Sequence, residues 1–167
     1  HRAIENWLAV SGAIHACEAG TPLFRFVVQE ILREPYSGRS FPGFESIDLS
    51  FAELDALVRN ARPDWKAALS SVKGIYLISD GKRYVGSAYG EHGIWPRWVG
   101  YAASGHGGNV ELRNLVSDPT LEYCREAFRF SLLEHRPVLT PDSTIIDRES
   151  FWKQILLTRG EYGLNRN

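Results

Sequence analysis

The 167-residue chain contains no methionine and only two cysteines, Cys17 and Cys124. Because a natural chain usually begins with methionine, the absence predicts a fragment or a processed form whose native N-terminus lies further upstream. The two cysteines are far apart and form no C-x-x-C pair, so the sequence has no zinc signature and gives no ground for a disulfide. We expect both thiols to be reduced, as in the cytoplasm.

The sequence also lacks a long apolar segment and an excess of either charge. No apolar run approaches the roughly 18 residues of a membrane helix, and no basic segment followed by an apolar stretch opens the chain, so we expect neither a membrane span nor a signal peptide. The formal net charge is −1, with 44% hydrophobic and 23% charged residues. A nucleic-acid site would have to be a local patch, since phosphate contacts supply most of such affinity. Composition alone favours a small-molecule enzyme or an adaptor.

Residues 1–71 show only structural patterns. Apolar spacing predicts a helix over 1–19, and alternating aromatic and β-branched residues predict a strand over 23–32. A short strand then precedes a helix that begins with the capping box formed by Ser50 and Glu53. We interpret this part as an N-terminal α/β accessory region, and it is a candidate contact for a protein partner or for a missing upstream region.

The segment 72–98 carries the most informative pattern in the chain. It is typical of two short strands joined by a tight turn, followed by a loop and a helix. The tripeptide Gly74-Ile75-Tyr76 lies in the first predicted strand, and Tyr84-Val85-Gly86 lies in the second. Arg97 follows inside the helix, whose first turn can accommodate Pro96.

These residues resemble the GIY-YIG nuclease family, which is named for the two tripeptides. The resemblance covers residues 72–167, which are 96 of the 167, and continues through Glu149 and Asn165. It implies an α+β fold in which a three-stranded antiparallel sheet is flanked by helices and the tripeptide hairpin forms two of the strands. We therefore expect residues 72–167 to be a GIY-YIG-like nuclease domain.

Glu149 is conspicuous even without the resemblance. The helix predicted from about residue 142 to about residue 158 has one apolar stripe, which consists of Ile145, Glu149, Trp152 and Leu156. A carboxylate on that stripe faces the core or a cleft and needs a cation or strong donors. The alternative is a partly exposed ion pair with Lys153, worth about 0.3–0.5 kcal/mol. The resemblance implies instead that Glu149 holds one divalent ion, Mg²⁺ or Mn²⁺.

The resemblance also implies catalytic roles for Arg97, Tyr76 and Tyr84. Arg97 is expected to hold the scissile phosphate, which a guanidinium can contact bidentately, although an arginine in isolation is more often a solvated surface charge. One of the two tyrosines is expected to activate the attacking water, and the sequence leaves open which one. Tyrosines also favour strands for packing alone, and a phenol with a pKa of about 10 needs a nearby cation to become a better base.

Four supporting positions follow from the resemblance, namely Ser87, Tyr101, His106 and Asn165. Ser87 directly follows the second tripeptide, and Tyr101 shares a helix face with Arg97. Several relatives have histidine at the position of Tyr101, so a histidine relay is in doubt there, and its hydroxyl is left to bond substrate or water. His106 is either a site residue or an exposed loop histidine, and Asn165 is either a neighbour of the metal glutamate or a turn residue.

The register of the tripeptide hairpin decides how the tyrosines are placed. A three-residue loop over 79–81 puts Tyr76 directly opposite Tyr84, and we expect this loop because the resemblance implies that both tyrosines reach one site. Both phenols then lie on one face of the sheet, shared with Arg97 and Glu149. A two-residue loop would separate the phenols onto opposite faces.

Together with the resemblance, these residues predict a metal-dependent DNA endonuclease. The expected reaction is hydrolysis of a phosphodiester by direct attack of a tyrosine-activated water. The alternative is a catalytically inactive nucleic-acid-binding or adaptor module on the same fold. The presence of every expected residue type favours the enzyme, whereas the neutral net charge favours the module.

Overall fold

A computed structural model describes residues 38–116, 120–160 and 163–166, so the helix and the strand expected before residue 37 lie outside the described residues. The described residues belong to one compact unit, Ser37–Asn167. Its elements in chain order are η2 (Phe44–Ser46), β1 (Asp48–Ser50), α2 (Phe51–Arg59), α3 (Pro63–Ser70), β2 (Val72–Ser79), β3 (Arg83–Ala88), α4 (Trp95–Ser104), α5 (Val110–Leu115), α6 (Glu122–Ala127), β4 (Arg129–Pro137) and α7 (Asp142–Ile155). None of these helices is both long and apolar enough to cross a bilayer.

The four strands form one antiparallel sheet in the order β1-β4-β2-β3. The α+β class with a sheet flanked by helices is confirmed, but the expected count of three strands is wrong. The fourth strand is β1, which pairs Leu49 with Phe130 of β4. It belongs to the segment that we interpreted as an accessory region, and the resemblance did not extend to it.

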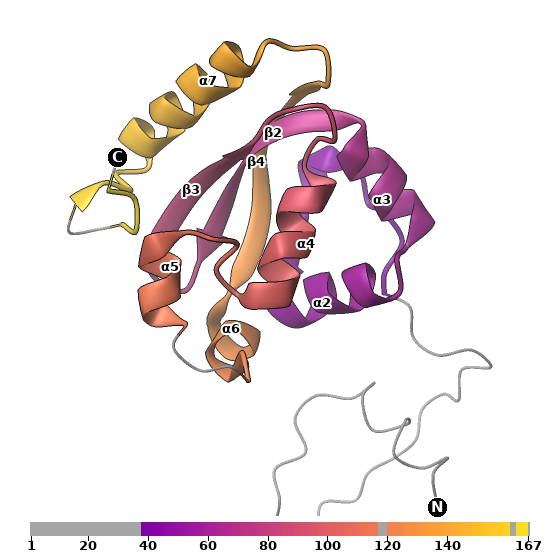
Figure 1. Cartoon of the computed structure of the whole chain (residues 1–167), viewed down its shortest axis with the longest axis horizontal. Helices are drawn as coiled ribbons and strands as arrows, with labels where there is room; N and C mark the ends of the chain where they lie inside the picture. Colours follow the sequence, from indigo (N-terminus) through magenta and orange to yellow (C-terminus); the bar gives the residue numbers. More distant parts are fainter. Residues whose placement is uncertain (1–37, 117–119, 161–162, 167) are drawn as a thin grey trace, which may run out of the picture. The chain divides into compact units, whose positions relative to one another are not determined.

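Helices cover both faces of this sheet (Figure 1). One face packs under α2, α3 and α4 in a cluster that includes Phe51, Trp65, Tyr76, Trp98 and Phe130. The other face packs under α7 in a smaller cluster built on Ile75, Val85 and Ile145. Even-numbered residues of β2 therefore point to the first face and odd-numbered residues to the second, as the two-residue period of a strand requires.

Residues 48–70 share the core of the residues that follow them. Several of their apolar side chains are at most 1% exposed, namely Leu49, Phe51, Leu54, Leu57, Trp65 and Leu69. They pack in the same cluster as Tyr76, Trp98 and Phe130. The expected division between residues 71 and 72 therefore does not coincide with an edge of this core.

A fragment of residues 72–167 is expected not to fold on its own. It loses the six buried side chains just described, and each large-to-small change at such positions costs about 2–5 kcal/mol, against a total stability of about 5–15 kcal/mol. Circular dichroism and thermal unfolding check this, with a fragment of residues 38–167 as the control. Cooperative unfolding of the shorter fragment would contradict the shared core.

Local sequence signals define the ends of the helix that carries Arg97. Pro96 occupies the first turn of α4, as expected, because its missing N–H needs no partner there. The helix ends at Gly105, which adopts φ 73° and donates its N–H to the Tyr101 carbonyl. Arg97 and Tyr101 therefore lie on one face of a helix whose length is fixed at both ends.

The register of the β2–β3 hairpin differs from the expected one by two positions. Ser79 pairs with Arg83, so the three-residue loop covers 80–82 rather than 79–81. Tyr76 lies opposite Gly86 and not opposite Tyr84, which corrects the expectation. The loop is set by Asp80, whose carboxylate accepts the N–H of Lys82 at 2.9 Å.

The shift leaves the faces of the two tyrosines unchanged. A register change of two residues preserves the parity of every pair, whereas a change of one would exchange the faces. Tyr76 and Tyr84 consequently lie in the same cluster, as expected, and Ile75 and Val85 lie in the other. Gly81 has φ 100°, the positive value that a glycine in a tight turn adopts easily.

Candidate active site

Arg97 is the centre of a hydrogen-bonded cluster beneath α4. Its Nε donates to the Tyr76 hydroxyl at 3.0 Å, and one terminal nitrogen donates to the Gly107 carbonyl at 2.9 Å. The other terminal nitrogen donates to the Tyr101 hydroxyl at 3.3 Å. The two hydroxyls are 3.1 Å apart and bond each other. These contacts fix the plane of a half-buried guanidinium.

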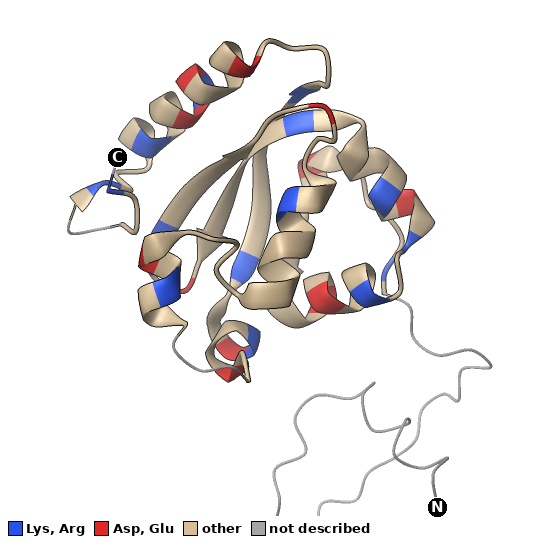
Figure 2. Ribbon diagram, in the orientation of Figure 1, with Lys and Arg blue, Asp and Glu red and all other residues tan. Residues whose placement is uncertain are grey.

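All the partners of this guanidinium are neutral oxygens. Burial raises the pKa of Tyr76 and of Tyr101 well above the usual value of a phenol, so both stay protonated near neutral pH. No ion pair joins Arg97 to an acidic side chain of the described residues. It is also the one charged residue of α4 (Figure 2). The arrangement presents a positive charge that lacks a counter-anion among these residues.

Tyr76 and Tyr84 differ in what their hydroxyls contact. Tyr76 is fully buried, and its hydroxyl is engaged by Arg97 and Tyr101. Tyr84 retains 6% exposure, and its hydroxyl bonds no other described residue. It also lies close enough to Arg97 to interact with it electrostatically. Of the two tyrosines, Tyr84 is therefore the one with a hydroxyl that remains available.

Gly86 makes room for the Tyr76 ring. A Cβ atom at this position would lie 2.6 Å from the Tyr76 hydroxyl oxygen, closer than real Cβ contacts allow. The Tyr76 ring of the first tripeptide therefore requires glycine at position 86 of the second tripeptide. The register explains this, since the two residues face each other across the strands.

Gly86→Ala is expected to displace Tyr76 and with it Arg97. The added methyl group should destabilise the fold by about 1–3 kcal/mol, as overpacked cores do, and should lower any activity that depends on Arg97. Chemical denaturation and a turnover assay measure the two effects. Gly100→Ala is the matched control, because a Cβ there meets nothing within 4 Å. Equal behaviour of the two variants would refute the packing role.

Glu149 lies on the opposite face of the sheet from the tyrosines. Its stripe on α7 faces the sheet as expected, with Ile145 buried and Trp152 and Leu156 packed beside it. One Glu149 oxygen accepts the Ser87 hydroxyl at 2.7 Å, and the other accepts the Lys153 ammonium at 3.0 Å. The expectation that Glu149 shares a face with both phenols is wrong, because α7 crosses the odd-numbered side.

The two groups of side chains meet at the edge strand β3. Gly86 borders the Tyr76 hydroxyl on one face, and the next residue, Ser87, holds Glu149 on the other. β3 is the outermost strand of the described sheet on this side. The C-terminal tail pairs with this edge at Arg83 and Val85, so a ligand could contact both groups along the part of the edge that begins at Gly86.

The surroundings of Glu149 fit a divalent ion in part. A carboxylate offers about four lone pairs, and two are used by Ser87 and Lys153, so oxygen ligation remains open. Mg²⁺ is commonly bound by one or two carboxylates together with water and substrate phosphate. No group of three or more metal-ligating side chains occurs in the described part of the chain, and the Lys153 ammonium opposes a second cation. The site therefore fits an ion held through one carboxylate, in competition with Lys153.

His106 lies in the loop that also supplies the Gly107 carbonyl to Arg97. Its Nδ1 accepts the N–H of Gly108 at 3.0 Å, which places the proton of a neutral ring on Nε2. Partial burial and the nearby Arg113 lower the pKa of His106. A neutral His106 in this tautomer can donate a hydrogen bond from Nε2 but cannot accept a proton there.

Asn165 ties the C-terminal tail to the edge strand. Its side-chain oxygen accepts the Val85 N–H at 2.9 Å, and its side-chain nitrogen donates to the Val85 carbonyl at 2.8 Å. These bonds show that Asn165 holds the strand that bears Ser87. The amide keeps a second N–H and a second lone pair, and the expected position beside the metal glutamate stays a prediction.

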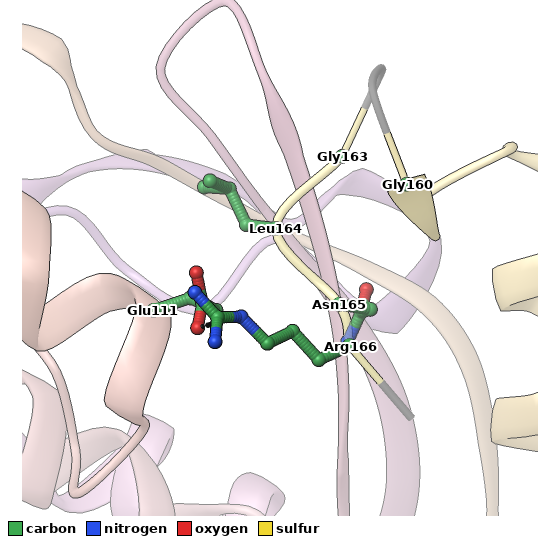
Figure 3. A pocket seen from close by; sticks show the side chains of 6 residues that line it. All are labelled: Glu111, Gly160, Gly163, Leu164, Asn165 and Arg166. Atoms are coloured by element: carbon green, nitrogen blue, oxygen red, sulfur yellow. Dashed lines mark ion pairs between the residues drawn. The ribbon is translucent and has the colours of Figure 1, made fainter.

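A surface pocket of about 460 Å³ lies between this tail and α5. Arg166 reaches across it toward Glu111, with which it forms an ion pair (Figure 3). The remaining lining residues are Gly160, Gly163, Leu164 and Asn165. Neither Arg97 nor Glu149 lines the pocket, so it is separate from those two side chains, and Asn165 is the one predicted site residue that borders it.

The sequence left two features of the site unrecognised. The Gly107 carbonyl, which accepts from Arg97, is a backbone group in the loop of His106, and no side-chain pattern points to it. Lys153 was considered only as a partly exposed partner of Glu149, yet it is 4% exposed. Lys153 directly follows Trp152 at the border of the apolar stripe, and this position was the sequence signal that could have predicted its burial.

Comparisons of the chain with protein-family models, with curated proteins and with solved structures return no significant match. The resemblance to GIY-YIG nucleases therefore depends on the two tripeptides and on the residues that follow them, and the function is inferred from the arrangement of those residues.

Proposed function

We propose that this protein is a DNA endonuclease of the GIY-YIG type that hydrolyses a phosphodiester bond with the help of a divalent metal ion. Arg97 binds the scissile phosphate, Glu149 holds the ion, and Tyr84 takes the proton of the attacking water. Tyr76, Tyr101, Ser87 and Asn165 position these groups. The site lies along the part of the β3 edge that follows Val85, beyond the contacts of the C-terminal tail.

The observation that carries this proposal is the state of Arg97. A half-buried guanidinium whose described partners are three neutral oxygens retains its full positive charge and two N–H groups for an anion. A phosphodiester supplies that anion, and its charge grows in the transition state. Preorganised donors are worth most where charge develops, because they need no reorientation during the reaction.

The choice between the two tyrosines follows from their contacts. A general base must reach the proton that it removes, directly or through one water. The Tyr76 hydroxyl is buried against Arg97 and Tyr101, and burial raises its pKa, so it holds Arg97 in place. Tyr84 has an uncommitted hydroxyl beside the same cation. His106 lies near the cluster as a donor that could stabilise the leaving oxygen.

Glu149 would hold the metal ion from the α7 side of the edge strand. A bound Mg²⁺ or Mn²⁺ supplies charge that polarises the phosphate and neutralises the leaving oxygen. Ser87 orients the carboxylate through the hydrogen bond to one of its oxygens. Asn165 keeps this part of β3 in place through its two bonds to Val85.

Nicking of supercoiled plasmid tests the proposal. The full chain should convert supercoiled DNA to the open circular form in Mg²⁺ or Mn²⁺ and not in excess chelator. A protein that binds DNA without hydrolysing it would not convert supercoiled plasmid to the open circular form. Absence of nicking over a range of metal concentrations and DNA substrates would remove the endonuclease proposal.

A second candidate is a nucleic-acid-binding module that has lost catalysis. The observation in its favour is the Glu149–Lys153 pair, since an ammonium already neutralises the carboxylate on which metal binding depends. This candidate keeps Arg97 as a phosphate contact without hydrolysis. Salt-dependent DNA binding that Arg97→Ala weakens, without any nicking, would favour it over the enzyme.

A further inference from the structure

Lys153 is buried beside the one carboxylate of the candidate site. The residue is 4% exposed, and its ammonium lies 3.0 Å from one oxygen of Glu149. The Glu149 side chain is 17% exposed, so the pair is largely removed from solvent. The Ser87 hydroxyl occupies the other oxygen at 2.7 Å. An ammonium at this depth cannot reach a DNA backbone and acts through Glu149.

A buried carboxylate without a counter-ion is strongly unfavourable, and removing one partner of a buried pair leaves the other uncompensated. Lys153 therefore compensates the charge of the Glu149 carboxylate and holds it in one orientation when no metal ion is bound. The same ammonium repels a divalent ion that approaches the same carboxylate, and this repulsion is weakly screened away from bulk water.

We propose that Lys153 is a positioning residue that competes with the divalent ion for Glu149 and so weakens metal binding at this site. The inference depends on the proposed role of Glu149 in holding the ion. It adds that the ion binds only when Lys153 moves away from the carboxylate oxygen that it contacts. The site is then preorganised without metal and binds metal weakly.

Titration of the full chain with Mn²⁺, followed by the electron paramagnetic resonance signal of the free ion and without DNA, tests this. Lys153→Met, which replaces the side chain with an unbranched uncharged one that is a single heavy atom shorter, should bind Mn²⁺ about tenfold or more tightly than the unmodified chain. Lys153→Arg keeps the charge and should bind no more tightly. Glu149→Gln combined with Lys153→Met should lose the tight site, which shows that Glu149 holds the ion.

A purely structural lysine gives a different result. Lys153→Met would then lower the unfolding temperature without a gain in Mn²⁺ affinity, and equal or weaker Mn²⁺ binding in this variant overturns the proposal. If the variant is unfolded without metal, recovery of its circular dichroism spectrum with Mn²⁺ supports the proposal. If Mn²⁺ does not recover the spectrum, the proposal is tested instead by a labelling experiment on the unmodified chain.

The labelling experiment treats the unmodified chain with an amine-reactive acetylating reagent. Peptide mass spectrometry then measures how much of Lys153 is acetylated, which reports whether the ammonium leaves Glu149. Labelling should rise at least about threefold in saturating Mn²⁺, because the amine gains exposure when the ion displaces it. Unchanged or reduced labelling overturns the proposal. Neither measurement uses DNA, so a chain that gives the expected result yet does not nick plasmid would remove only the endonuclease function.

Discussion

Arg97→Ala is expected to lower the turnover number for plasmid nicking by about 10²–10³-fold, the usual effect of losing one preorganised donor to a developing charge. The guanidinium is held by three oxygens, so its position is set before substrate binds. The variant should still fold, with a stability loss of about 1–3 kcal/mol from the partners left without a donor. Nicking rates and thermal unfolding separate the two effects.

Arg97→Lys is expected to fail as a replacement. A lysine ammonium has no planar fork and cannot contact Tyr76, Tyr101 and Gly107 while it also holds a phosphate. Arg59→Ala is the matched control, since Arg59 is an exposed arginine that pairs with Asp55 on α2. Full activity in the lysine variant would show that charge alone matters at this position.

Glu149→Gln is expected to reduce nicking by about 10³-fold or more, because a neutral amide neither binds a divalent ion well nor offsets its charge. DNA binding measured by fluorescence anisotropy should remain within a few-fold of the unmodified chain, since Arg97 lies on the other face of the sheet. The substitution also replaces the carboxylate that lies 3.0 Å from the Lys153 ammonium with a neutral amide, at a cost of about 1–3 kcal/mol. Thermal unfolding measures that cost directly.

Asp147→Asn is the control for Glu149→Gln. Asp147 lies two residues earlier on α7 and is exposed. Its substitution by asparagine therefore removes an equal charge from the same helix without changing a residue of the site. It should nick plasmid at the unmodified rate. Turnover by Glu149→Gln at the rate of this control would remove the assigned role of Glu149.

Sequence periodicity and the resemblance together were enough to place the tyrosines but not to pair them. Alternation fixed which residues of one strand share a face, the resemblance favoured a three-residue over a two-residue loop, and the resulting shared face is confirmed for Tyr76 and Tyr84. The pairing partner of Tyr76 was wrong because two three-residue loops, 79–81 and 80–82, preserve the same parity. Two features of the structure distinguish the two loops. The Asp80 carboxylate accepts the Lys82 N–H, and Gly86 leaves room for the Tyr76 ring.

The position of Glu149 shows a different limit. Its helical stripe correctly predicted that the carboxylate faces the sheet. A stripe does not say which face of the sheet the helix covers, because that depends on the path of the chain after β4. The strand β1 was outside the resemblance for a similar reason: three residues carry too little alternation to assign a partner 80 positions away.

The pairing of β1 with β4 affects the order in which the chain can fold during synthesis. Ser50 pairs with Arg129, so β1 emerges from the ribosome long before its only described strand partner. Until then the apolar side chains of α2 and α3 lack the sheet surface that buries them, and such exposed surface attracts chaperones or aggregates. Pairings that close long loops also slow folding. We therefore expect the nascent chain to remain sensitive to proteases until β4 has left the exit tunnel, after which protection should arise in one step.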